Sequence, residues 1–190
     1  MSLSDHFLPT FDIRIKTSLK MKNTVIKYGL YAFISGFVLF GLPFLFGMGI
    51  DFDYGELIGY TAMVLSLLFV YFGIKHYRDN VNDGKVSFGK ALAIGMLIAL
   101  FSGIGVAIFD YIYTTQINPD FVTDYLDHSI KKMEATLSPE ELKVKRAALT
   151  QQMEDYGSPG FMAFMMLTSV IILGFMISLI SGLILQRKNS

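Results

Sequence analysis

The sequence predicts an all-α polytopic membrane protein: four transmembrane helices plus an extramembrane amphipathic helical hairpin between the third and fourth spans. Four windows contain no Asp, Glu, Lys or Arg, and they cover residues 28–50, 57–74, 91–109 and 156–186. A helix of about 20 apolar residues crosses a bilayer. A chain of 190 residues has too small a core to bury four such segments in water. We therefore expect a lipid bilayer as the principal partner of this chain.

Composition excludes several function classes. Lys+Arg and Asp+Glu both number 16, so no net charge recruits nucleic acid, and we expect no nucleic-acid partner. The chain has no cysteine, which excludes a disulfide framework, a thiolate metal site and a thiol nucleophile. No nucleophile elbow, phosphate loop or dinucleotide fingerprint occurs in the sequence. We accordingly predict a protein that is not an enzyme, with no catalytic residue, no bound metal and no cofactor.

The first 113 residues of the chain hold three of the spans. Residues 1–20 are interpreted as an extension, disordered or preceding the native start, because Met21 offers a second start, and residues 21–187 form a single membrane domain. The spans are predicted at about 25–46, 57–74 and 88–113. Leu42-Pro43 predicts a kink or an early stop of the first span, because proline removes a backbone donor.

The polar segment that follows predicts the hairpin, at residues 119–156. Asn118-Pro119, Ser138-Pro139 and Ser158-Pro159 each combine an N-cap residue with proline at the first helical position. Glu141 completes a capping box with Ser138. These signals predict two helices broken at Ser138-Pro139, folded back as a hairpin or lying on the membrane, and then a fourth span at 159–185.

Basic residues predict the orientation. Lys and Arg gather before the first span, between the second and third spans and after the fourth, whereas the loop after the first span has none. The positive-inside rule then places both termini in the cytoplasm, with the acidic loop and the hairpin outside.

Small residues at every fourth position predict close helix packing in the third and fourth spans. The third span carries Ala91, Gly95, Ala99, Gly103 and Ala107, and the fourth carries Gly174, Ser178 and Gly182. We expect these ridges to pack within the chain. The alternative is a homodimer or another membrane protein partner that uses the same faces.

Asp110 is the deepest acidic residue, near the end of the third span, and charges inside spans are costly and often functional. Three interpretations remain open for its carboxylate. It is solvated at the interface, paired with a hairpin lysine such as Lys131 or Lys132, or part of a weak cation site.

The loop after the first span carries Asp51, Asp53 and Glu56, which are expected to form a solvated acidic loop on the same side of the membrane as Asp110. The ordered ligand pattern of a calcium loop is absent from these residues. Together with Asp110 they are the candidates for binding or coupling.

Parts of the sequence resemble a known bacterial family. The segments 21–23, 73–79, 84–91 with Gly95, and 117–121 resemble the signature of the family named domain of unknown function 4199. The resemblance covers roughly residues 21–187. It implies a four-span protein of the bacterial inner membrane, and it transfers no activity or catalytic residue. Within the motif, we expect Tyr77 and Arg78 to anchor at the headgroup level.

Two classes of function remain. The first is a non-enzymatic membrane component that binds or assembles a partner. The second is a small transporter or channel subunit, with Asp110 and the acids Asp51, Asp53 and Glu56 as an outer vestibule. Few polar residues lie inside the spans, which favours the first class.

Overall fold

The computed structural model describes residues 4–45 and 52–187, with the backbone alone for residues 4–18, 44–45 and 56. Within these ranges the chain forms six α-helices, and π-helical turns extend two of them. In chain order the elements are α1 (Ser4–Leu45), α2 (Phe52–His76) with η1 (Tyr77–Val81), α3 (Phe88–Ile112) with η2 (Tyr113–Ile117), α4 (Phe121–Glu134), α5 (Pro139–Tyr156) and α6 (Pro159–Leu185). The all-α prediction is confirmed.

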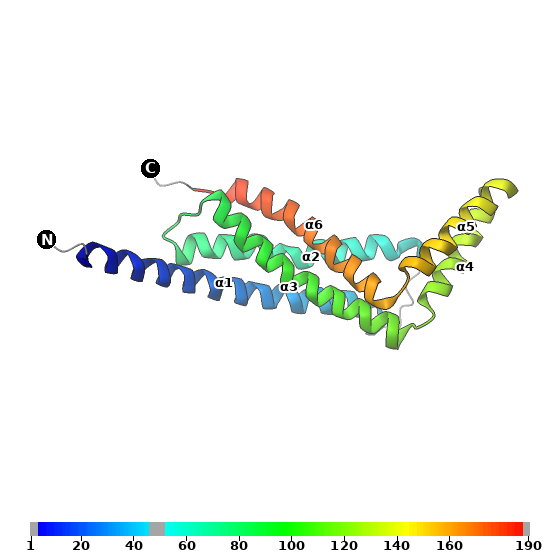
Figure 1. The fold of residues 1–190 in the computed structure, drawn as a ribbon, viewed down its shortest axis with the longest axis horizontal. Coiled ribbons are helices and arrows are strands. Elements are labelled where there is room, and N and C mark those ends of the chain that lie inside the picture. The colour runs from blue at the N-terminus through cyan, green and yellow to red at the C-terminus, as the bar shows by residue number, and fades with distance from the viewer. Residues whose placement is uncertain (1–3, 46–51, 188–190) are drawn as a thin grey trace.

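The four long helices form an elongated bundle, and α4 and α5 project from one end of it as a hairpin (Figure 1). We call this the hairpin end. Helix α1 begins and α6 ends at the opposite end, which we call the termini end (Figure 1). Helix α3 packs against α1, α2 and α6, so it is the central element of the bundle.

Four stretches are long and apolar enough to cross a membrane, as predicted: Leu19–Pro43, Phe52–Val81, Phe88–Ile117 and Pro159–Leu185. The bounds of the fourth match the prediction. The second and third continue through η1 and η2 to Val81 and Ile117, because the polar residues at their ends include no proline or glycine.

The helix of the first span extends beyond the predicted bounds at its N-terminal end. The backbone of α1 begins at Ser4 and so includes residues 4–20, which the sequence led us to interpret as an extension, disordered or preceding the native start. The described part of α1 runs through Pro43 to Leu45, and residues 46–51 lie outside the described residues, so the kink or early stop expected at Leu42-Pro43 stays a prediction.

The core of the bundle is apolar, as in a soluble protein, but the outer surface of the spans is apolar as well. In the core, Leu67, Val70, Ile94, Ile98 and Val170 are fully buried. Large aliphatic and aromatic side chains also cover the outside of the spans; they include Leu68, Phe72, Ile104, Ile172 and Phe175. An apolar exterior of this extent fits lipid surroundings.

The small-residue ridge of α3 lies against α6 of the same chain. A Cβ atom added at Gly95 would meet the side chain of Ser178, and one at Gly174 would meet Ala99. On another face of α3, a Cβ at Gly105 would meet the backbone carbonyl of Phe33 in α1. Close backbone approach therefore fixes α3 between α1 and α6.

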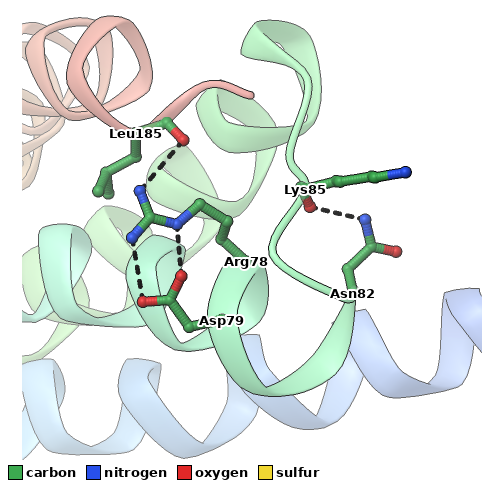
Figure 2. Close-up of polar contacts among 5 residues, drawn as sticks. All are labelled: Arg78, Asp79, Asn82, Lys85 and Leu185. Atoms are coloured by element: carbon green, nitrogen blue, oxygen red, sulfur yellow. Dashed lines mark hydrogen bonds and ion pairs between the residues drawn. The ribbon is translucent and has the colours of Figure 1, made fainter. Parts of the chain in front are cut away.

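At the termini end, Arg78 joins α2 to the end of α6 (Figure 2). Its guanidinium donates to both carboxylate oxygens of Asp79, at 2.5 and 3.0 Å, and to the carbonyl of Leu185 at 3.5 Å. The Arg187 amide donates to the carbonyl of Val86 at 2.9 Å. This part of the family motif therefore connects the second, third and fourth spans.

The sequence suggested that Tyr77 anchors at the headgroup level, and the structure places it elsewhere. Its side chain is fully buried in the core, and Lys90 lies over its ring with Nζ 5.8 Å from the centroid. The π-helical turn that begins at Tyr77 keeps this residue beneath neighbouring helices instead of at the helix end.

The predicted break in the hairpin is confirmed at Ser138-Pro139. The Glu141 amide donates to Ser138 Oγ at 3.5 Å, and the Ser138 amide donates to Glu141 Oε2 at 3.2 Å. Both halves of the capping box are thus present at the start of α5.

Candidate functional site

A cavity of about 300 Å³ lies at the hairpin end of the bundle. Its walls come from α1, α2, α3, η2 and α6, and the first turns of α4 complete it. Apolar side chains such as Leu39, Met63 and Met166 form part of its wall. The volume is at the lower end of the range for small-molecule sites, and a largely apolar lining is typical of them.

Aromatic rings dominate the lining of the cavity. These residues are Phe40, Phe52, Tyr60, Phe109, Tyr113, Phe121 and Tyr125. Phe121 links them, because its ring centroid lies 5.8 Å from that of Phe52 and 5.7 Å from that of Tyr113. Phe109 stacks on Tyr113 with centroids 6.4 Å apart. The rings support one another across α2, α3, η2 and α4 and give the cavity a rigid aromatic side.

Asp110 is the charged residue of the lining, among those that the structure describes with side chains. Its side chain belongs to the last turns of α3, and the residue is only 7% exposed. Its Oδ2 atom is buried and has no hydrogen-bond partner among the described residues. One of the two carboxylate oxygens is therefore buried, and the three interpretations of Asp110 given above stay predictions.

The predicted pairing of a hairpin lysine involves a different acid. Lys132 Nζ donates to Asp53 Oδ1 at 2.5 Å, and His128 Nε2 lies 3.4 Å from the same oxygen. The ring of His128 also packs on Phe52, with centroids 5.3 Å apart. These contacts connect α4 to the start of α2 at the rim of the cavity.

The other predicted acids are placed as follows. Asp53 lies in the first turn of α2 and not in a loop, a position in which the helix dipole favours a carboxylate. Asp51 lies outside the described residues, and the side chain of Glu56 is also outside them. The structure thus brings Asp53 and Asp110 to the hairpin end, where only Asp110 lines the cavity.

Several polar groups deeper in the bundle are hydrogen-bonded, whereas the buried hydroxyl of Tyr77 at the termini end has no partner among the described residues. The hydroxyl groups of Ser66 and Ser102 are hydrogen-bonded at 2.8 Å, and Ser178 donates to the carbonyl of Gly174 at 2.6 Å. In the cavity wall, Ser169 donates to the carbonyl of Met165 at 2.9 Å. Asp110 differs from these serines because its buried oxygen lacks such a partner among the described residues.

Sequence reasoning selected Asp110 and missed the cavity around it. The cavity depends on aromatic residues far apart in sequence, such as Phe40, Phe52 and Phe121, that meet only when α4 folds over the bundle. The clustering of aromatic residues around the ends of the spans was the available signal. That pattern equally fits interfacial anchoring, so it did not predict a cavity.

Comparison with known proteins identifies the family. The family described as "Protein of unknown function (DUF4199)" matches residues 27–187. No curated protein and no solved structure matches the chain. The chain therefore belongs to the DUF4199 family, as the motif at the termini end indicated.

Proposed function

We propose that this member of the DUF4199 family is a non-enzymatic membrane component that binds a small, largely apolar molecule in the cavity at its hairpin end. One observation carries the proposal: the cavity is lined by a buried carboxylate oxygen that has no hydrogen-bond partner among the described residues. Such an atom costs on the order of 1–3 kcal/mol. A ligand with one donor group would recover that free energy.

The surroundings of Asp110 support binding more than catalysis. An acid–base or nucleophilic mechanism needs a second reactive group within hydrogen-bond reach of the first. The hydroxyl of Ser169, which lines the same cavity, donates to a helix carbonyl, and Asn118 Nδ2 donates to the hydroxyl of Tyr113 at 3.3 Å. Asp110 thus serves in this proposal as a recognition group and not as a catalytic residue.

A small transporter or channel subunit is the alternative, and the position of Asp110 inside a candidate span favours it. A pathway would need further polar groups between the cavity and the termini end. Buried polar side chains on the way, such as Ser66 and Ser102, are bonded to each other. This arrangement favours a closed binding site over a conduit.

We also propose a bacterial inner-membrane location with both termini in the cytoplasm, on the strength of the Lys and Arg distribution. The small-residue ridges of α3 and α6 lie against each other within the chain, so these two faces are not free for a protein partner. Reporter fusions at Gly84 and Glu140 test the orientation. An external signal at Gly84 would contradict it.

The binding proposal is tested by calorimetric titration of the full chain in lipid nanodiscs with phenethyl alcohol, an apolar ring with one hydroxyl donor. Empty nanodiscs correct for partitioning into lipid. We expect saturable binding that Gly59→Leu weakens at least about tenfold, because Gly59 lines the cavity and an added Cβ there meets no atom within 4 Å. Gly89→Leu is the matched control, since its Cβ also meets open space, at the other end of α3.

A further inference from the structure

We infer that the ligand of this cavity is a small organic cation: a protonated amine with an apolar body, whose ammonium group binds the carboxylate of Asp110. The inference rests on the proposed binding function and names the chemical class of ligand. Three features of the described residues carry it: the isolation of the carboxylate, the aromatic lining and the scarcity of other oxygen ligands.

The charge of Asp110 is not balanced within the described part of the chain. The residue is 7% exposed, and its Oδ2 has no hydrogen-bond partner there. Lys132, one of the two hairpin lysines named above as pairing candidates, forms an ion pair with Asp53 instead. A buried carboxylate is costly unless it is paired and hydrogen-bonded. An ammonium group supplies the opposite charge and an N–H donor at once.

The aromatic lining suits the rest of such a molecule. Ammonium groups bind to the faces of tyrosine and phenylalanine rings, at distances up to about 6 Å from the centroid. Phe109 directly precedes Asp110, Tyr113 follows it by three residues, and both line the same cavity. Phe121 and Tyr125 line it from α4. The carboxylate and the aromatic rings therefore belong to one cavity, which a charged head and an apolar body can occupy together.

An inorganic cation fits the site less well. Calcium takes six to eight oxygen ligands, and magnesium requires near-octahedral coordination. Within residues 4–45 and 52–187, as far as side chains are described, no three His, Cys, Asp or Glu residues form a group that could hold a metal ion. A single carboxylate in an apolar wall is the arrangement expected for an organic cation. The volume of about 300 Å³ limits that cation to a small amine.

The test compares phenethylamine with phenethyl alcohol in the same calorimetric titration. The two molecules share the ring and the linker, and at neutral pH they differ in charge. We expect the amine to bind the wild-type chain at least about tenfold more tightly, a difference of about 1.4 kcal/mol. In Asp110→Asn, which removes the charge and keeps the shape, the two affinities should agree within about twofold.

Further variants separate the outcomes. Asp110→Glu should retain the preference for the amine. Gly59→Leu should weaken the binding of both molecules, and Gly89→Leu should weaken the binding of neither. Circular dichroism of each variant in nanodiscs checks that the helices are intact. Equal affinity of wild type for the two molecules, or an amine preference that survives in folded Asp110→Asn, would overturn the inference and leave the binding function standing. Absence of saturable binding by either molecule would overturn both.

Discussion

The surface along which α3 packs against α1, α2 and α6, which we call the α3 seam, differs from the hairpin end of the same bundle in packing and in hydrogen bonding. Along the seam, glycine allows backbones to touch, as at Gly105, and buried hydroxyls such as those of Ser66 and Ser102 are paired. At the hairpin end, a cavity of about 300 Å³ remains, and the Oδ2 atom of Asp110 lies buried without a partner among the described residues.

The contrast separates what holds the fold from what the fold presents. Lipid supplies no hydrophobic drive between helices, so close packing and internal hydrogen bonds have to stabilise the bundle. A cavity lacks close packing, and an isolated carboxylate lacks internal hydrogen bonds. Sites that reduce stability in this way are typical of function. We therefore assign stability to the seam and ligand binding to the hairpin end.

The largest effect is expected from breaking the seam with Gly105→Ala. A Cβ at this position meets the backbone carbonyl of Phe33, which cannot move aside as a side chain would. Overpacking of this kind costs about 1–3 kcal/mol. The free energy of unfolding in mixed micelles measures the loss. Gly89→Ala adds the same methyl group in open space and should lower the free energy of unfolding little. Equal losses in the two variants would show that the seam is loosely packed.

A smaller effect is expected from the hydrogen bond inside the core. A double-mutant cycle with Ser66→Ala and Ser102→Ala should give a coupling free energy of about 0.6 kcal/mol, and at most about 1.7 kcal/mol, as for other interhelical bonds in lipid. The two hydroxyls are 2.8 Å apart and fully buried, so no water competes for them. Strict additivity of the two changes would contradict the pairing.

The smallest effect is local to the hairpin and depends on pH. Hydrogen bonds from the side chain and amide of Ser138 hold the pKa of Glu141 below its ordinary value. A lowered pKa in the folded state means that the fold stabilises the charged carboxylate. The contribution of this carboxylate to the stability of α5 is therefore complete above the ordinary glutamate pKa of about 4.3, and it is lost as pH falls through the folded pKa. Amide exchange in the first turn of α5 should rise over that window, and Glu141→Gln should abolish the dependence. The same dependence in Glu141→Gln would exclude the capping box as its cause.

Much of the fold could be predicted because its signals are local or periodic. The charge-free windows indicated the spans, and the cap-plus-proline pair at Ser138-Pro139 indicated the break between α4 and α5. The small-residue ridge of the third span indicated a closely packed face, and α3 presents that face to α6. Gly105 escaped notice because it falls outside the four-residue repeat, on the face toward α1.

The remaining differences arise from tertiary context. Polar residues after the second span were expected to end its helix, yet the chain stays helical to Val81 and buries Tyr77. Asp53 was assigned to a loop, although an acidic residue also suits the first turn of a helix. The sequence singled out Asp110 but not its surroundings, because the rings of Phe52, Phe121 and Tyr125 meet only in the folded chain.

The most direct test of the division between seam and site is the stability of ligand-free Asp110→Leu. Leucine has the same branched shape as aspartate and no charge, so it removes the unpaired carboxylate and adds apolar contacts to the cavity wall. If Asp110 is retained for binding, the free energy of unfolding in nanodiscs should stay the same or rise. A loss as large as that of Gly105→Ala would show that Asp110 supports the fold, and would contradict its assignment to ligand binding.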